Sequence, residues 1–152
     1  MTDITGHKTA EDKLYLCAIE DVCSGWIVGY SIDSRMKSRL AVQALENAVA
    51  MRGDVADCVV HSDGGSQFRS RKMLRALRRH RMVGSMGRVR SSGDNAAMES
   101  FFALLQKNVL DCRTWVTREQ LRIVMVIWIE RTYHRRRQAR LGRLRPSNWR
   151  PT

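Results

Sequence analysis

The sequence lacks the marks of membrane-bound and secreted proteins. No secretory signal peptide opens it, and no apolar run approaches the roughly 20 residues that a membrane-spanning helix needs. Its four cysteines form no CxxC pair, and no histidine stands near them at a zinc-like spacing. These absences exclude a transmembrane helix and a zinc module. They predict a protein of the reducing cytoplasm that has no membrane partner.

Acidic residues are missing from two long stretches of the chain. Residues 69–90 hold nine basic side chains and residues 131–150 hold eight, and neither stretch contains an Asp or Glu. In the whole chain 27 Lys and Arg stand against 15 Asp and Glu, a formal net charge of +12. Charge of this size and clustering favours a polyanionic partner such as nucleic acid, and arginine suits phosphate groups. The alternative is a solvated surface that serves only solubility.

The pattern of apolar residues predicts an α/β protein. The chain has 152 residues, of which 43% are hydrophobic, enough for one globular domain with one core. Apolar and β-branched segments predict strands at 1–5, 13–21, 26–32, 57–61 and 82–86. Apolar spacings of three and four predict helices at 37–51, 70–81, 95–109 and 117–136. This order predicts one five-stranded mixed sheet flanked by helices on both faces.

The same pattern predicts which side chains face the core. In the helix at 70–81 we expect Leu74 and Leu77 to face inward and the arginines outward. Cys17 and Cys58 fall in apolar runs, so we expect both to be small core residues. The inner stripe of the last helix is expected to consist of Ile123, Val124, Ile127 and Trp128.

Three carboxylates have surroundings that suggest a shared role. Asp3 lies in the first predicted strand, Asp63 follows the fourth, and Glu99 lies in a predicted helix; the 35 residues 64–98 separate the last two. Three carboxylates can hold two divalent cations roughly 3.5–4 Å apart, and such a pair can cut or join a phosphodiester. Mg²⁺ prefers oxygen ligands and keeps several waters, so three carboxylates and a substrate phosphate suffice. If the first and fourth strands are neighbours, the three acids converge.

Each acid also has a simpler interpretation. Asp3 is also explained as a surface residue near a frayed terminus, and Asp63 as a turn residue or helix-entry cap before Gly-Gly-Ser. Glu99 is also explained as a solvent-facing helix residue. His61 is expected to be structural, because His61-Ser62-Asp63 places neighbouring side chains on opposite faces of a strand and so cannot form a serine triad. Spacing alone is a weak signal among 15 acids.

Several motifs together resemble the catalytic core of bacterial insertion-sequence transposases related to retroviral integrases. The resemblance covers essentially the whole chain. It rests on Thr2-Asp3-Ile4-Thr5, His61-Ser62-Asp63-Gly64-Gly65-Ser66-Gln67-Phe68, Asp94-Asn95-Ala96-Ala97-Met98-Glu99-Ser100-Phe101-Phe102, and an ending of Tyr133-His134-Arg135-Arg136-Arg137 with Leu141-Gly142 and Pro146.

The resemblance implies a ribonuclease H-like fold and a DNA transposase of the bacterial cytoplasm. Such enzymes cut at element ends and join the freed 3′-hydroxyl to target DNA, usually as homo-oligomers, and a dimer on DNA is expected here. Asp3, Asp63 and Glu99 match the family's catalytic, metal-binding acids for two Mg²⁺ or Mn²⁺ ions. The catalytic core would span 1–138, with 139–152 as its basic tail. DNA contacts are predicted at Arg69, Arg71, Lys72, Arg75, Arg88, Arg90, Asn95, Lys107, Arg135, Arg136 and Arg137.

Two departures from the family pattern leave alternatives open. The family normally carries an N-terminal helix-turn-helix region, whereas this sequence starts two residues before Asp3. The family also has a basic residue seven positions after the glutamate, where this chain has Gln106, with Lys107 one further on. We therefore expect impaired chemistry in the isolated chain. The alternatives are a non-catalytic DNA-binding or assembly module and a ribonuclease H or junction nuclease with the same fold and metals.

Overall fold

The computed structural model describes residues 1–86 and 96–140, in which the predicted order of strands and helices is confirmed. The strands are β1 (Thr2–Lys8), β2 (Lys13–Asp21), β3 (Trp26–Asp33), β4 (Val59–Ser62) and β5 (Val83–Met86). The helices are α1 (Ser38–Arg52), α2 (Arg71–Arg79), α3 (Ala96–Asn108), the 3-10 turn η1 (Leu110–Cys112), α4 (Arg118–Ile127), the π-helical turn η2 (Trp128–Tyr133) and α5 (His134–Arg140).

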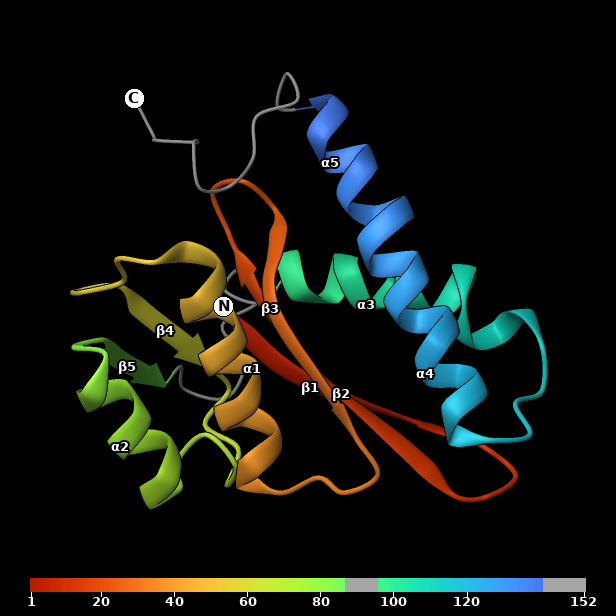
Figure 1. The fold of residues 1–152 in the computed structure, drawn as a ribbon, viewed down its shortest axis with the longest axis horizontal. Coiled ribbons are helices and arrows are strands. Elements are labelled where there is room, and N and C mark those ends of the chain that lie inside the picture. The colour runs from red at the N-terminus through yellow and green to blue at the C-terminus, as the bar shows by residue number, and fades with distance from the viewer. Residues whose placement is uncertain (87–95, 141–152) are drawn as a thin grey trace.

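The five strands lie in two sheets instead of the single mixed sheet that was predicted. β1, β2 and β3 form an antiparallel sheet in that order, and β4 pairs with β5 in parallel. β1 and β4 contact each other, so the two sheets lie side by side (Figure 1). The physical reason for the break is length: β4 and β5 have four residues each, so few backbone hydrogen bonds are available to continue the larger sheet.

Helices cover both faces of the three-stranded sheet, as predicted. Alternate side chains of β2 point to opposite faces. Leu16 and Ala18 join a core with side chains of α3, α4 and η2, whereas Cys17 and Ile19 join a core with α1 and α2. Figure 1 shows the same division, with α1 and α2 on one side and α3 to α5 on the other. Any group on β1 therefore faces one of these two helical layers.

The inward face of α2 differs from the prediction by one residue. Leu77 is buried as expected, but Leu74 is 38% exposed, and Met73 and Ala76 take its place in the core. The helix begins at its N-cap Ser70, whose hydroxyl accepts a hydrogen bond from the Met73 amide at 3.1 Å. From that start, positions 73, 76 and 77 share one face, and Leu74 lies at its margin.

The last helix shows a similar shift. Its start is as predicted, since the Thr117 hydroxyl accepts from the Gln120 amide at 3.1 Å. Ile123 and Ile127 are exposed, however, and the buried stripe runs through Leu121, Met125, Trp128 and Ile129. The π-helical turn η2 follows, so the helix is not uniform to its end. Within the described residues, no helix is both long and apolar enough to cross a bilayer.

The cysteines divide between the core and the surface. Cys17 is fully buried, as expected. Cys58 is exposed, and so is the next residue, Val59, with which β4 begins. The apolar run around residue 58 therefore does not lie wholly in the core. The short parallel sheet of β4 and β5 has one covered face and one face open to solvent.

Candidate functional site

Asp3 lies on the face of β1 that α3 covers. It pairs with Ala18 of β2, whose side chain belongs to the core shared with α3. Its neighbours point the other way: the Thr2 hydroxyl lies 3.6 Å from Cys17 Sγ, and Ile4 packs against the core shared with α1. The Asp3 carboxylate accepts a hydrogen bond from the Ile4 amide at 2.8 Å. Asp3 therefore lies in a half-buried strand and not at a frayed end of the chain.

Asp63 follows the last residue of β4 and is exposed. Its Oδ1 accepts a hydrogen bond from the Gly65 amide at 3.0 Å, and Gly64 has a φ of +79°, which glycine adopts without strain. Asp63 is thus a turn residue, one of its two simpler interpretations, but it does not cap α2, because Ser70 does. The turn fixes the carboxylate just beyond the end of the strand.

Glu99 lies in the first turn of α3 and is exposed. Met98 and Phe101 on either side of it are fully buried, so α3 is anchored in the core while Glu99 faces out. An acid in the first turn also interacts favourably with the positive end of the helix dipole. The helix itself contacts β1, the strand of Asp3.

The three acids lie on neighbouring elements but do not form a closed group. β1 contacts both β4, which leads to Asp63, and α3, which carries Glu99. Across residues 1–86 and 96–140, however, no three His, Cys, Asp or Glu side chains gather into a group that could hold a metal ion. The donor atoms suit Mg²⁺, which prefers carboxylate oxygen, but their placement here does not complete a site for it. Their metal-binding role stays a prediction.

Most of the predicted DNA-contacting residues in the described part are exposed. In α2, Met73, Ala76 and Leu77 are buried, so the opposite face presents basic side chains to solvent. Arg79 differs from them because it forms an ion pair with Glu46, which also pairs with His80. Arg88, Arg90 and Asn95 lie outside the described residues. The exposed candidates are Arg69, Arg71, Lys72, Arg75, Lys107, Arg135 and Arg136.

Arg137, which the prediction grouped with Arg135 and Arg136 as a DNA contact, makes contacts within the protein. Its Nε donates to the Tyr133 hydroxyl at 3.3 Å, and its guanidinium lies over the Tyr133 ring at 5.4 Å. The Tyr133 hydroxyl donates in turn to the Gly25 carbonyl at 2.8 Å. The spacing of four residues between Tyr133 and Arg137 places both on one helical face, a signal that the sequence did contain.

Glu20 is a buried acid that sequence reasoning missed. It is 3% exposed, and burial raises its pKa to about 7, although the positive charges of Arg137 and the N-terminal amine oppose this shift. Its Oε2 has no hydrogen-bond partner among the described residues. The backbone of Glu20 exchanges two hydrogen bonds with Met1, at 2.8 and 3.0 Å, next to the strand of Asp3. An acid inside the apolar strand 13–21 was the available signal.

Comparison with known proteins places this fold and these motifs in a family. The model of the Integrase core domain matches residues 1–92. Transposase InsF for insertion sequence IS3A of Escherichia coli (strain K12) is 35% identical over 97% of this chain and 51% of its own length. The chain thus spans about half the length of the curated relatives it matches.

Solved structures show the fold independently. The HTLV-2 integrase catalytic core domain in complex with magnesium (trimeric form) has a TM-score of 0.62 at 18% identity, over 86% of this chain and 83% of that one. The catalytic domain of Mos1 mariner transposase has a TM-score of 0.66 at 14% identity, over 92% and 74%. These likenesses show the mixed α/β, ribonuclease H-like fold of such catalytic cores. From the matched family model and the fold, the chain belongs to the Integrase core domain family.

Proposed function

We propose that this chain is the catalytic domain of a bacterial insertion-sequence transposase, which cleaves DNA phosphodiesters and transfers the strands in the cytoplasm. One observation carries the proposal: the strand of Asp3 contacts both the strand that leads to Asp63 and the helix that carries Glu99. Three acids carried by these elements could converge on one site. The catalytic core would span 1–138, with 139–152 as a basic tail.

We further propose that Asp3, Asp63 and Glu99 bind two Mg²⁺ or Mn²⁺ ions. Bound ions of this kind activate the attacking oxygen and stabilise the leaving oxygen of a phosphodiester. The proposal requires β4 to continue the sheet beside β1, as one five-stranded sheet, because that pairing brings the turn of Asp63 toward Asp3. The contact between β1 and β4 and the magnesium complex of the HTLV-2 integrase core support it.

The basic face of α2 and the exposed Arg135 and Arg136 are proposed to hold the DNA. Each presents arginine to solvent, and residues 64–86 contain no acid that would repel phosphate. The proposed assembly is a homo-oligomer, a dimer on DNA, because strand transfer at two element ends needs two active sites.

A plasmid-nicking assay with Mn²⁺ tests the catalytic proposal. Asp63→Asn and Glu99→Gln should each reduce nicking to background while the protein stays folded and binds DNA, since each removes one anionic ligand. The matched control is Asp54→Asn, an exposed acid whose carboxylate accepts a hydrogen bond from the Ala56 amide at 3.2 Å. Full activity in either site variant would refute the assignment.

A second candidate function is a DNA-binding or assembly module without catalysis. The separation of the three acids in the described structure favours it. This module would show salt-sensitive DNA binding and no metal-dependent nicking in the same assay. A third candidate, a ribonuclease H or junction nuclease, would instead prefer RNA–DNA hybrids or branched DNA over linear duplex.

A further inference from the structure

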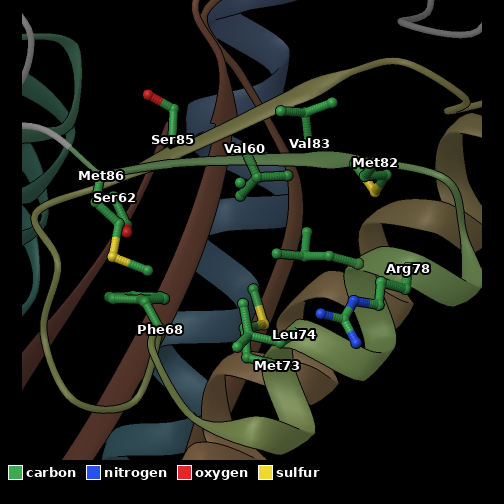
Figure 2. Close-up of a pocket in the computed structure, with 12 residues that line it drawn as sticks. Val60, Ser62, Phe68, Met73, Leu74, Arg78, Met82, Val83, Ser85 and Met86 are labelled. Atoms are coloured by element: carbon green, nitrogen blue, oxygen red, sulfur yellow. The ribbon is translucent and has the colours of Figure 1, made fainter.

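A cleft of about 310 Å³ lies between α2 and the β4–β5 sheet, outside the predicted acidic centre (Figure 2). Its walls are mainly apolar and include the ring of Phe68 and the thioethers of Met73 and Met86, with Ser62, Ser85 and Arg78 as polar members. Leu74, which the sequence pattern placed in the core, instead lines this cleft and is 38% exposed. The cleft therefore explains why one face of α2 keeps an apolar side chain open to solvent.

One end of the cleft adjoins the turn of Asp63. Ser62, the residue before Asp63, lines the cleft, and so does Phe68 from the segment that follows the turn. A Cβ placed on Gly64 would lie 3.9 Å from Met86 Sδ, so the turn and this end of the cleft are in contact. In Figure 2, Ser62, Phe68 and Met86 gather at this end and Arg78 at the other.

The charge of the cleft is of one sign. None of its lining residues is an acid, and Arg78 is its only charged lining residue in the described part of the chain. Arg78 is exposed on the basic face of α2, close to Arg75 and Arg71. The cleft thus combines apolar side chains with a guanidinium group, which binds phosphate.

We propose that this cleft holds one unstacked nucleobase of the bound DNA strand, with Arg78 on its phosphate. The faces of a base are apolar and polarisable, so they pack well on an aromatic ring and on methionine sulfur. The cavity is near the lower limit for ligand pockets, which suits one base and not a longer segment. Unstacking is easiest at a nick or a frayed end, and such an end would lie beside Asp63.

The proposal rests on the proposed function for the identity of its ligand, so its test uses a readout that does not depend on cleavage. The probe is duplex DNA with a frayed end that carries 2-aminopurine at successive positions, since this base fluoresces more when it leaves the stack. Bound to the full chain without metal, one position near the end should brighten and the others should not.

Two variants and two matched controls locate the signal. Leu74→Trp fills the cleft and Arg78→Gln removes the phosphate contact; each should abolish the increase. Leu74→Trp should also weaken frayed-end binding about tenfold, as expected for one lost stacking contact. Ile123→Trp places the same ring on the exposed side of α4, and Arg39→Gln removes an exposed arginine of α1; both should keep the increase. Arg78 is exposed, so its variant keeps the test valid if Leu74→Trp does not fold.

An increase at no position, or one that survives both cleft variants, would overturn the proposal. The two claims also fail separately. Mn²⁺-dependent nicking without a fluorescence increase would remove the cleft site and leave the transposase function standing. A cleft-dependent increase in a protein that does not nick DNA would support the cleft site and remove the transposase function.

Discussion

Among the acids of the described residues, Glu20 is the most buried. It is buried in β2, and burial raises its pKa to about 7. The folded state therefore holds a proton that the unfolded chain releases near the ordinary glutamate pKa of 4.5. Stability conferred by the protonated form is present at low pH and is lost as the pH rises from the unfolded pKa through the folded pKa.

We predict that Glu20→Gln stabilises the protein more at pH 8.5 than at pH 5, because glutamine cannot ionise. The difference in unfolding free energy between the two pH values should be about 2–3 kcal/mol, the size expected for this pKa shift. Chemical denaturation of the wild type and the variant at both pH values measures it. Asp54→Asn is the control, and an equal effect of Glu20→Gln at both pH values would show that burial does not perturb this group.

Single side chains also show what the sequence could not decide. The helical period predicted for α2 was correct. An inward face through Leu74 and one through Met73, however, fit the sequence about equally well. The structure resolves this through the Ser70 cap, which sets where the helix begins. The prediction that Cys58 is a core residue was wrong for a similar reason, because a short apolar run does not reveal that one face of its sheet is open.

Because Met73 is buried and Leu74 is not, substitutions of these two residues should change stability by different amounts. Met73→Ala should destabilise the protein by about 2–5 kcal/mol because its side chain is 2% exposed and its removal leaves a cavity. Leu74→Ala should cost less than about 1 kcal/mol because this side chain lies at the surface. Thermal or urea unfolding of both variants checks the order, and a larger loss for Leu74→Ala would contradict the placement of α2.

Among the elements, η2 and α5 together hold the edge of the larger sheet. Tyr133 bonds to the Gly25 carbonyl, and the His134 ring stacks on Trp26 at 4.6 Å between centroids. His134 Nε2 also donates to the Ile27 carbonyl at 3.1 Å. These contacts satisfy backbone carbonyls before and along β3, which is an edge strand in the described part of the chain. The motif at 133–137 thus has a structural part as well as an exposed basic part.

Substitution of Arg137 should therefore affect stability, whereas substitution of Arg136 should affect DNA binding. Arg137→Ala should lower the unfolding free energy by about 1–2 kcal/mol, since it removes the bond to Tyr133 and the contact with its ring. Arg136→Ala should leave stability within about 0.5 kcal/mol. It should reduce the salt dependence of DNA binding by about one phosphate contact. Denaturation and salt-titrated DNA binding of both variants test these predictions. A loss of stability in Arg136→Ala but not in Arg137→Ala would contradict them.

For the whole molecule, the sequence predicted the ribonuclease H-like class, the strand order and helices on both faces. It did not predict two sheets, because whether β1 pairs with β4 depends on long-range packing that periodicity does not encode, and in the described residues the two strands do not pair. The convergence of the acids depends on that same pairing. Asp3, Asp63 and Glu99 were found by their motifs, but motifs do not fix distances between elements.

Charge on the whole surface gives a further prediction. With a formal net charge of +12, the protein should bind duplex DNA with strong salt dependence. Arg71→Gln and Arg75→Gln on α2 should each lower the slope of log affinity against log salt by about one unit. Arg39→Gln on α1 is the matched control. An unchanged slope in both α2 variants would place the DNA on another face.

The most direct test of the account is a crystal structure of the chain with DNA and Mn²⁺, in which anomalous scattering locates the ions. The account predicts Mn²⁺ bound by the carboxylates of Asp3, Asp63 and Glu99, with β4 paired beside β1 in one sheet. Mn²⁺ found elsewhere, or Glu99 still facing solvent while DNA and metal are bound, would contradict it.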